Sequence, residues 1–285
     1  MATKRWVQVK QVEAVGAGKT AIITPPTNVR YHALALKYGT DTAGGATEAN
    51  MITELPDIEV YLGGVVQRKF SASELFKINK TKKQATVAGW LPIFFSEPNR
   101  RTQIEQEMGA WGMADVGPNG FQIEASIADN SGQAATLKCM ALVDDKQEAP
   151  VGITKWRRNT ITIGATGENE YKLNTQRGDS VQGLYMFEGT AGDIDSFRLE
   201  WDGLKIADVL ETDVDAMLDT YFKQQYDKVS GVRHIPLDGG APADVLRTIK
   251  YVDGKPQNIQ ELLLTLNMAN AANVTMISEL VGTPD

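Results

Sequence analysis

Short runs of alternating apolar and polar residues recur along the whole chain, separated by turns rich in glycine, proline and asparagine. This alternation is typical of β-strands that face a core on one side. The first half predicts strands at Trp6–Val15, Ala21–Thr24, Tyr31–Lys37, Ile58–Leu62, Val87–Phe95, Phe121–Ile127 and Leu137–Val143. The second half predicts strands at Asn159–Ile163, Tyr171–Asn174, Val181–Phe187, Phe197–Trp201, Val232–Leu237, Ile249–Val252, Leu262–Leu266 and Val274–Leu280.

Helical spacing interrupts the strands in a few places. One predicted helix covers residues 102–113, with Ile104, Met108 and Trp111 on a single face. The pairs Ser71 with Glu74 and Thr212 with Asp215 have the spacing of helix-start caps. The second pair opens an amphipathic segment whose apolar residues are Val214, Met217, Leu218, Tyr221 and Phe222.

The chain also contains an internal repeat, which organises these elements. The segment 58–66 aligns with 197–205, so that Gly64 and Gly203 are 139 residues apart, and 123–127 aligns with 262–266 at the same separation. Upstream, 31–39 aligns with 181–189 at 150 residues, and a longer loop at Thr40–Asn50 accounts for the difference. We therefore expect two related domains, 1–150 and 151–285, joined near Glu148–Gly152. The predicted fold class is all-β, as two tandem eight-stranded jelly-roll barrels with short helices in the inter-strand loops.

Composition narrows the classes of function. The 285 residues are 42% hydrophobic and 23% charged, as in globular proteins, and the net charge of −7 argues against nucleic-acid binding. Nowhere do 18 apolar residues run together, so we expect neither a membrane span nor a signal peptide. Cys139 is the single cysteine, which excludes an intrachain disulfide and is consistent with folding in a reducing cytoplasm.

The candidate catalytic motifs are either incomplete or more simply interpreted as structural residues. Residues 16–20 resemble the end of a phosphate-binding loop, but Glu13 stands where its first glycine should be, so a hairpin turn is expected there. His32 and His234, the two histidines, are interpreted as structural, and Cys139 as a small buried residue. We therefore predict no catalytic, cofactor-binding or metal-binding residues, and a protein that is not an enzyme.

Two charged regions leave alternatives open. The acid-rich stretch comprises Asp193, Asp195, Asp202, Asp208, Glu211, Asp213, Asp215 and Asp219. It lacks the glycine and glutamate of an EF-hand loop, so a solvated helix face is favoured, with calcium held between subunits as the alternative and no ligands named. The basic segment 4–10 is interpreted as an edge strand, with contact to anionic lipid or a neighbouring subunit as the alternative.

Three segments together carry a family resemblance. They are Trp156–Asn159, Asp193–Gly203 and Asp215–Phe222. Their order and spacing, with the tandem repeat, resemble the double jelly-roll major capsid proteins of tailless, membrane-containing phages, the corticoviruses among them. The resemblance implies a structural protein of the virion, whose homotrimers form pseudo-hexagonal capsomers of an icosahedral shell around an internal membrane. It also implies neighbouring trimers, vertex or minor capsid proteins and the membrane as partners, without direct contact to nucleic acid.

The resemblance leaves two further questions. Trp111, Met113 and Tyr226 are interpreted either as residues of subunit interfaces or as core residues. A glycan- or receptor-binding jelly-roll protein of a phage particle is the alternative function. That function would require exposed aromatic and amide side chains gathered on one loop surface, which the sequence does not visibly concentrate.

Overall fold

The computed structural model describes residues 3–39, 46–84, 86–129, 134–148, 152–173, 179–238, 245–252 and 255–285. The chain divides into two compact units. Unit 1 comprises Met1–Lys80, Gln84–Trp156 and Pro284–Asp285, and unit 2 comprises Thr81–Lys83 and Arg157–Thr283. Residues 149–151 of the expected junction and 40–45 of the expected long loop lie outside the described residues.

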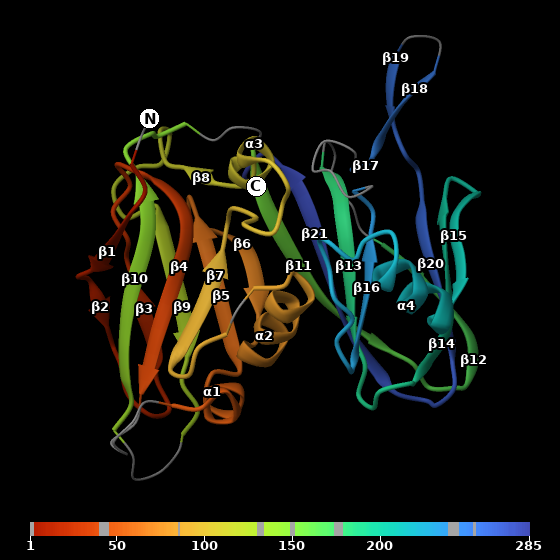
Figure 1. The fold of residues 1–285 in the computed structure, drawn as a ribbon, viewed down its shortest axis with the longest axis horizontal. Helices are drawn as coiled ribbons and strands as arrows, with labels where there is room; N and C mark the ends of the chain where they lie inside the picture. Colours follow the sequence, from red (N-terminus) through yellow and green to blue (C-terminus); the bar gives the residue numbers. More distant parts are fainter. Residues whose placement is uncertain are drawn as a thin grey trace. The chain divides into compact units, whose positions relative to one another are not determined.

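Unit 1 consists of two antiparallel sheets (Figure 1). The first has the order β1 (Arg5–Val9), β10 (Thr136–Asp144), β4 (Arg30–Gly39) and β7 (Trp90–Phe94), with β8 (Trp111–Gly112) paired to β4. The second has the order β6 (Val65–Phe70), β5 (Asp57–Leu62), β9 (Phe121–Ser126), β3 (Thr20–Ile23) and β2 (Val12–Glu13). Inward-facing residues alternate along these strands, and the rings of Tyr31, Phe95, Trp111 and Phe121 meet at centroid distances of 4.5–6.1 Å.

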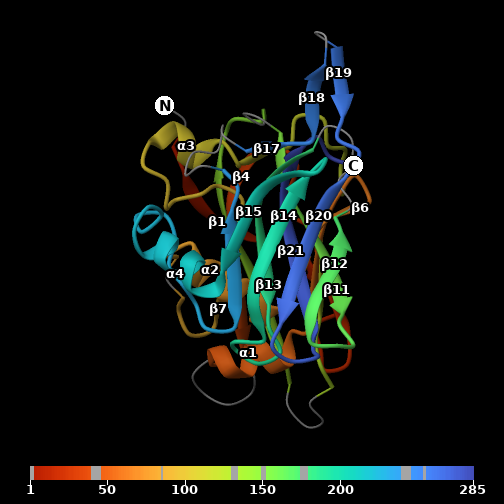
Figure 2. The same cartoon turned by 90° about the vertical axis from the view of Figure 1, so that its right-hand side faces the viewer.

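Unit 2 is built in the same way. One sheet has the order β11 (Ile153–Thr162), β21 (Asn273–Gly282), β13 (Ser180–Phe187) and β16 (Val232–Pro236), with β17 (Leu246–Arg247) paired to β13. The other has the order β12 (Gly167–Lys172), β20 (Leu262–Met268), β14 (Ile194–Trp201) and β15 (Leu204–Leu210), with β15 at one edge (Figure 2). A hairpin of β18 (Ile249–Val252) and β19 (Lys255–Asn258) projects from this unit (Figure 1).

The two units share one connectivity. Each unit has eight main strands among the described residues when the short strands β2, β8 and β17 and the β18–β19 hairpin are left aside. We number these eight strands 1 to 8 in chain order within each unit. In both units, one sheet then has the order 1-8-3-6 and the other has the order 2-7-4-5. Two packed antiparallel sheets with this strand order are a jelly roll. The predicted fold class, tandem jelly rolls with short helices between strands, is therefore confirmed.

The repeat also extends to backbone detail. Gly63 and Gly64 form the β5–β6 turn with φ of 62° and 84°, and Asp202 and Gly203 form the β14–β15 turn with φ of 48° and 78°. Positive φ at both central positions is the geometry of a type I′ hairpin, which matches the strand twist. The register then shifts after Val60 in one pair of strands and at the equivalent place, after Leu199, in the other.

Four helices occur in the described residues: α1 (Glu48–Glu54), α2 (Ala72–Thr81), α3 (Gln103–Glu107) and α4 (Glu211–Asp219). Ser71 and Glu74 form the expected reciprocal cap of α2, with N···O distances of 2.8 and 3.2 Å. None of these helices is long and apolar enough to span a bilayer.

Two helix predictions were wrong in part. The expected cap by Thr212 and Asp215 is absent because α4 begins at Glu211, and Asp213 instead accepts a hydrogen bond from the Leu210 backbone N–H at 3.2 Å. The expected helix over residues 102–113 is only α3, which ends at Glu107. Its apolar face is not buried: Ile104 is 79% exposed, whereas Trp111 belongs to β8.

Candidate assembly surface

The segment 16–20 forms the turn between β2 and β3, as expected from the sequence. The Lys19 backbone N–H donates to the Gly16 carbonyl at 3.2 Å, and Gly18 has a φ of 68°. A glycine in this left-handed conformation closes a tight hairpin without strain. Because a β-strand rather than a helix follows the turn, no helix N-terminus is available to bind phosphate.

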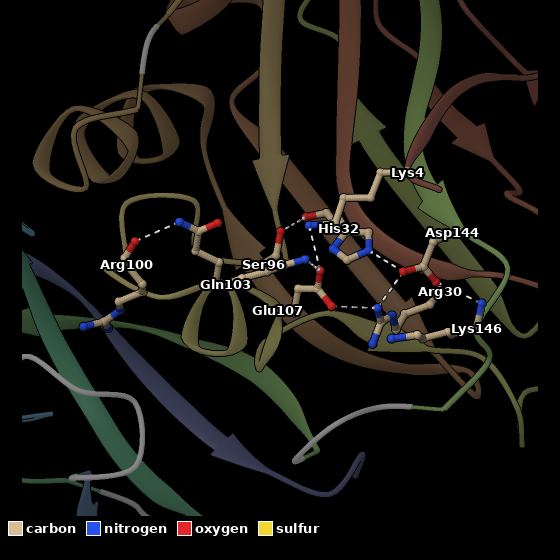
Figure 3. A network of polar contacts seen from close by, with 10 residues as sticks. Lys4, Arg30, His32, Ser96, Arg100, Gln103, Glu107, Asp144 and Lys146 are labelled. Carbon is tan, nitrogen blue, oxygen red and sulfur yellow. Dashed lines mark hydrogen bonds and ion pairs between the residues drawn. The ribbon is translucent and has the colours of Figure 1, made fainter. Parts of the chain in front are cut away.

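A buried ionic network joins β4, β10 and α3 of unit 1 (Figure 3). The Oδ2 atom of Asp144 accepts hydrogen bonds from Arg30 Nη2 at 2.5 Å and from His32 Nε2 at 2.9 Å. Glu107 lies 3.1 Å from both Arg30 Nη2 and Lys4 Nζ. Arg30, His32 and Asp144 are at most 4% exposed, so this histidine is closed to any substrate and holds strands together.

The ionisation of the network follows from its burial and its pairing. Burial lowers the pKa of His32, although its hydrogen bond to Asp144 acts in the opposite direction. Burial also favours the neutral form of Asp144, but the hydrogen bonds from Arg30 and His32 outweigh it and lower the pKa of Asp144. At neutral pH the carboxylate of Asp144 is therefore balanced by Arg30, beside an uncharged imidazole.

The other candidate residues are likewise part of the interior. The ring of His234 stacks on Tyr185 at 4.3 Å between centroids and meets Tyr226 edge-on at 4.5 Å. Cys139 is completely buried in β10, and this burial raises the pKa of its thiol to about 12. Its nucleophilic thiolate form is therefore not populated at neutral pH.

The acid-rich stretch is distributed over caps and ion pairs. Asp202 Oδ1 accepts from the backbone N–H groups of Gln260 and Glu261 at 2.8 and 2.9 Å. Asp219 pairs with Lys228 at 3.0 Å, and further acids of the stretch pair with lysine and arginine side chains. In the part of the chain that the structure describes, no three His, Cys, Asp or Glu side chains gather as a metal site would require.

The interface interpretation of the three large apolar residues was wrong. Trp111, Met113 and Tyr226 are 0%, 1% and 1% exposed, because each packs inside its own barrel. They cannot contact a second subunit without unfolding of the surrounding core.

Some of the exposed large apolar side chains lie on two edge strands. In unit 2, β15 pairs only with β14 within its sheet, and Leu204, Ile206 and Leu210 are 64%, 36% and 57% exposed. In unit 1, β1 pairs only with β10, and Trp6 is 54% exposed. The expected edge strand at residues 4–10 is thus confirmed. Apolar residues on unpaired edges are a common feature of surfaces that other chains cover.

A cavity of about 720 Å³ lies in unit 2 beside β15. Its walls come from β15, α4, β16 with the segment after it, and β17. Apolar residues predominate, among them Ala207, Val209, Leu218, Leu237 and Leu246, with Asp208 and Arg247 as charged members. The volume is within the range of pockets that bind small ligands. This cavity was not predicted from the sequence.

Comparison with known proteins assigns this architecture to a family. A model described as the viral coat protein P2 N-terminal domain matches residues 7–144, and one described as the viral coat protein P2 C-terminal domain matches residues 153–284. No curated protein matches the chain.

Solved structures share the fold across the whole chain. The major capsid protein P2 of bacteriophage PM2 is 19% identical, with 98% of this chain and 97% of that chain covered and a TM-score of 0.82. A chain of Sulfolobus turreted icosahedral virus is 11% identical, with coverage of 99% and 91% and a TM-score of 0.64. A chain of the PBCV-1 virus capsid is 11% identical, with coverage of 100% and 95% and a TM-score of 0.60. At these identities the likeness establishes the fold.

Proposed function

Because the chain belongs to the viral coat protein P2 family and is a structural component of a virion capsid, we propose that three copies form a homotrimeric capsomer. In this proposal the capsomers are pseudo-hexagonal tiles of an icosahedral shell that encloses an internal membrane. Neighbouring capsomers and vertex or minor capsid proteins are the further partners.

One observation carries the proposal: both units have the same eight-stranded connectivity within one chain. Three chains then supply six barrels of one kind, and six similar barrels suit a pseudo-hexagonal outline. Closed threefold symmetry lets each exposed surface of one copy be covered by a different surface of the next. Such cover would bury the exposed apolar residues of β15 and the exposed Trp6.

The internal membrane is the part of the proposal that rests on the resemblance to membrane-containing phages. Two cations give the membrane a modest physical basis: Lys4 directly precedes the edge strand β1, and Arg5 is its first residue. Both cations already pair with acids, Lys4 with Glu107 at 3.1 Å and Arg5 with Asp145 at 2.7 Å. Any attraction to an anionic lipid surface would therefore be weak.

Native mass spectrometry of the purified protein at neutral pH tests the trimer. A chain of 31.1 kDa predicts a species of about 93 kDa. Electron microscopy of the parent particles tests the rest, with pseudo-hexagonal tiles and a bilayer beneath the shell as the expected result. A protein that remains monomeric at micromolar concentration would contradict the proposal.

A further inference from the structure

The cavity in unit 2 corresponds to a filled site in unit 1. In unit 1 the guanidinium carbon of Arg68 lies 5.0 Å from the ring centroid of Phe95, 5.2 Å from that of Trp111 and 4.6 Å from that of Trp156. The ring of Trp156 also packs on Phe70 at 5.3 Å. Four aromatic rings and one cation therefore close the opening beside β6.

Strand register identifies the counterpart of Arg68 in unit 2. Arg68 pairs with Val60 across β5 and β6, and Ala207 pairs with Leu199 across β14 and β15. Val60 and Leu199 are related by the repeat distance of 139 residues, as are Arg68 and Ala207. The same distance relates Phe70 to Val209, so two large side chains are replaced by small ones.

The opposite wall of the site follows the repeat equally closely. Trp111 pairs with Tyr31 in unit 1, and Leu246 pairs with Val181 in unit 2. Tyr31 and Val181 are related by the repeat distance of 150 residues. Leu246 is therefore the counterpart of Trp111.

A hydrogen bond identifies the third counterpart. The backbone N–H of Phe95 donates to the His32 carbonyl at 2.9 Å, and that of Leu237 donates to the Gln182 carbonyl at 2.9 Å. His32 and Gln182 are again 150 residues apart. Ala207, Leu237 and Leu246, the counterparts of Arg68, Phe95 and Trp111, all line the cavity.

The filled site of unit 1 also contains Trp156, from the start of β11. The counterpart of Trp156 does not line the cavity of unit 2. The strand β1 has the place in unit 1 that β11 has in unit 2. The distance of 150 residues takes Trp156 back to Trp6, and the residues Thr3-Lys4-Arg5-Trp6 resemble Thr154-Lys155-Trp156. Trp156 is 3% exposed, whereas Trp6 is 54% exposed. Unit 2 thus has an empty site, and unit 1 carries an exposed tryptophan of the matching kind.

We propose that Trp6 of a second copy of this chain enters the cavity of unit 2 and packs on β15 as Trp156 packs on β6. The proposal rests on the proposed function, since it assigns one contact of the homotrimer. The chemistry agrees, because the walls of the cavity are predominantly apolar and suit an indole. Arg247 is the cation of these walls and can approach the face of the ring.

A contact of this kind is compatible with a closed ring. Each chain offers one Trp6 and one cavity on different surfaces, so the contact is heterologous. Repeated around a threefold axis, it leaves no Trp6 exposed and no cavity empty. It also places an aromatic anchor in a preformed pocket, which is how interface residues with the largest effects on binding are arranged.

The first test replaces Trp6 with alanine in the full chain. We expect the dissociation constant of the trimer, measured by analytical ultracentrifugation, to rise at least about 30-fold, the loss typical of a central aromatic anchor. Tyr251→Ala, which removes an aromatic side chain that is 70% exposed on β18, is the matched control and should leave it unchanged. Circular dichroism checks that both variants remain folded.

The second test measures the contact directly. In the double variant Trp6→Cys with Ala207→Cys, oxidation should link chains into covalent dimers and trimers on a non-reducing gel. Cys139 is buried, so background cross-linking is low. Trp6→Cys with Leu204→Cys is the control, because residue 204 lies about 10 Å along the strand from residue 207, beyond the reach of a disulfide.

The outcomes separate the inference from the proposed function. A monomeric wild-type protein would overturn both. A trimer that Trp6→Ala leaves unchanged and that the 6–207 pair does not cross-link would overturn only the inference. If such a trimer also retains an acyl-chain lipid in native mass spectra, the cavity is a lipid site instead.

Discussion

Asp144 connects β10 to β4, and its replacement by asparagine should strongly destabilise unit 1. The carboxylate accepts from Arg30 at 2.5 Å, from His32 at 2.9 Å and from the Lys146 backbone N–H at 2.9 Å. Breaking a buried ion pair by removing one partner costs about 3–5 kcal/mol. Arg30 keeps Glu107 at 3.1 Å, so we expect the lower value, about 3 kcal/mol. For a unit of this size, that loss lowers Tm by about 10 °C.

The neighbouring residue provides a matched control. Asp145 pairs with Arg5 at 2.7 Å, but both side chains are largely in solvent, and exposed pairs contribute little to stability. Differential scanning calorimetry of Asp144→Asn and Asp145→Asn should therefore show a large shift for the first and almost none for the second. Equal shifts would refute the assignment of stability to the buried network.

Three further changes test other parts of the fold by urea denaturation. Burial lowers the pKa of His32, so the folded state binds fewer protons than the unfolded state, and stability should fall as the pH drops below about 6.5. His32→Gln should flatten this dependence on pH. Gly203→Ala, at a φ of 78°, should cost about 1–2 kcal/mol, whereas Gly164→Ala, in open space, should be near neutral. Ser71→Ala removes a helix cap and should cost about 1 kcal/mol, while Thr212→Ala should not, since Thr212 caps nothing.

Most strands could be predicted from the sequence because their two faces have different neighbours. In β9 the burial of Phe121–Ser126 alternates strictly, as the side chains face the core and the surface in turn. Among the eight strands of each barrel, β6 in unit 1 and β15 in unit 2 were not predicted. Each contains a register shift that breaks the alternation, and β6 also buries the polar side chains of Gln67 and Arg68. Hydropathy does not predict the burial of a charged residue such as Arg68. The aromatic rings around it come from distant segments of the chain, so the local sequence does not indicate them either.

The helix over residues 102–113 shows the limit of periodicity. Its spacing would place Ile104, Met108 and Trp111 together, yet β8 pairs Trp111 with Tyr31 across the sheet. There the indole joins the ring cluster of unit 1, within 4.5 Å of Phe95 between centroids. Burial of a tryptophan among aromatic rings contributes more than a further helical turn, so long-range packing decides where α3 ends.

The cavity beside β15 arises from a difference between the two copies of the repeat. This difference is visible only when the two copies are compared. The sequence shows Arg68 and Phe70 replaced by Ala207 and Val209, but not that these positions border one opening. Strand register supplies that relation. In unit 1 the opening is closed by Trp156 of the same chain, and in unit 2 the equivalent opening is a cavity beside the exposed β15.

A barrel with such an opening leaves an apolar edge in water, which favours uncontrolled pairing with other chains. The exposed Trp6 is likewise an apolar group in contact with water, in the other copy of the repeat. If each copy covered its own opening, a folded chain would have no need of a partner. Trp156 comes from β11, the first strand of the second copy, and packs on β6 of the first copy. Trp6 holds the equivalent place in β1. In the proposed contact, Trp6 of a second copy covers the opening of unit 2, so a feature repeated in both copies would become a directional contact between chains.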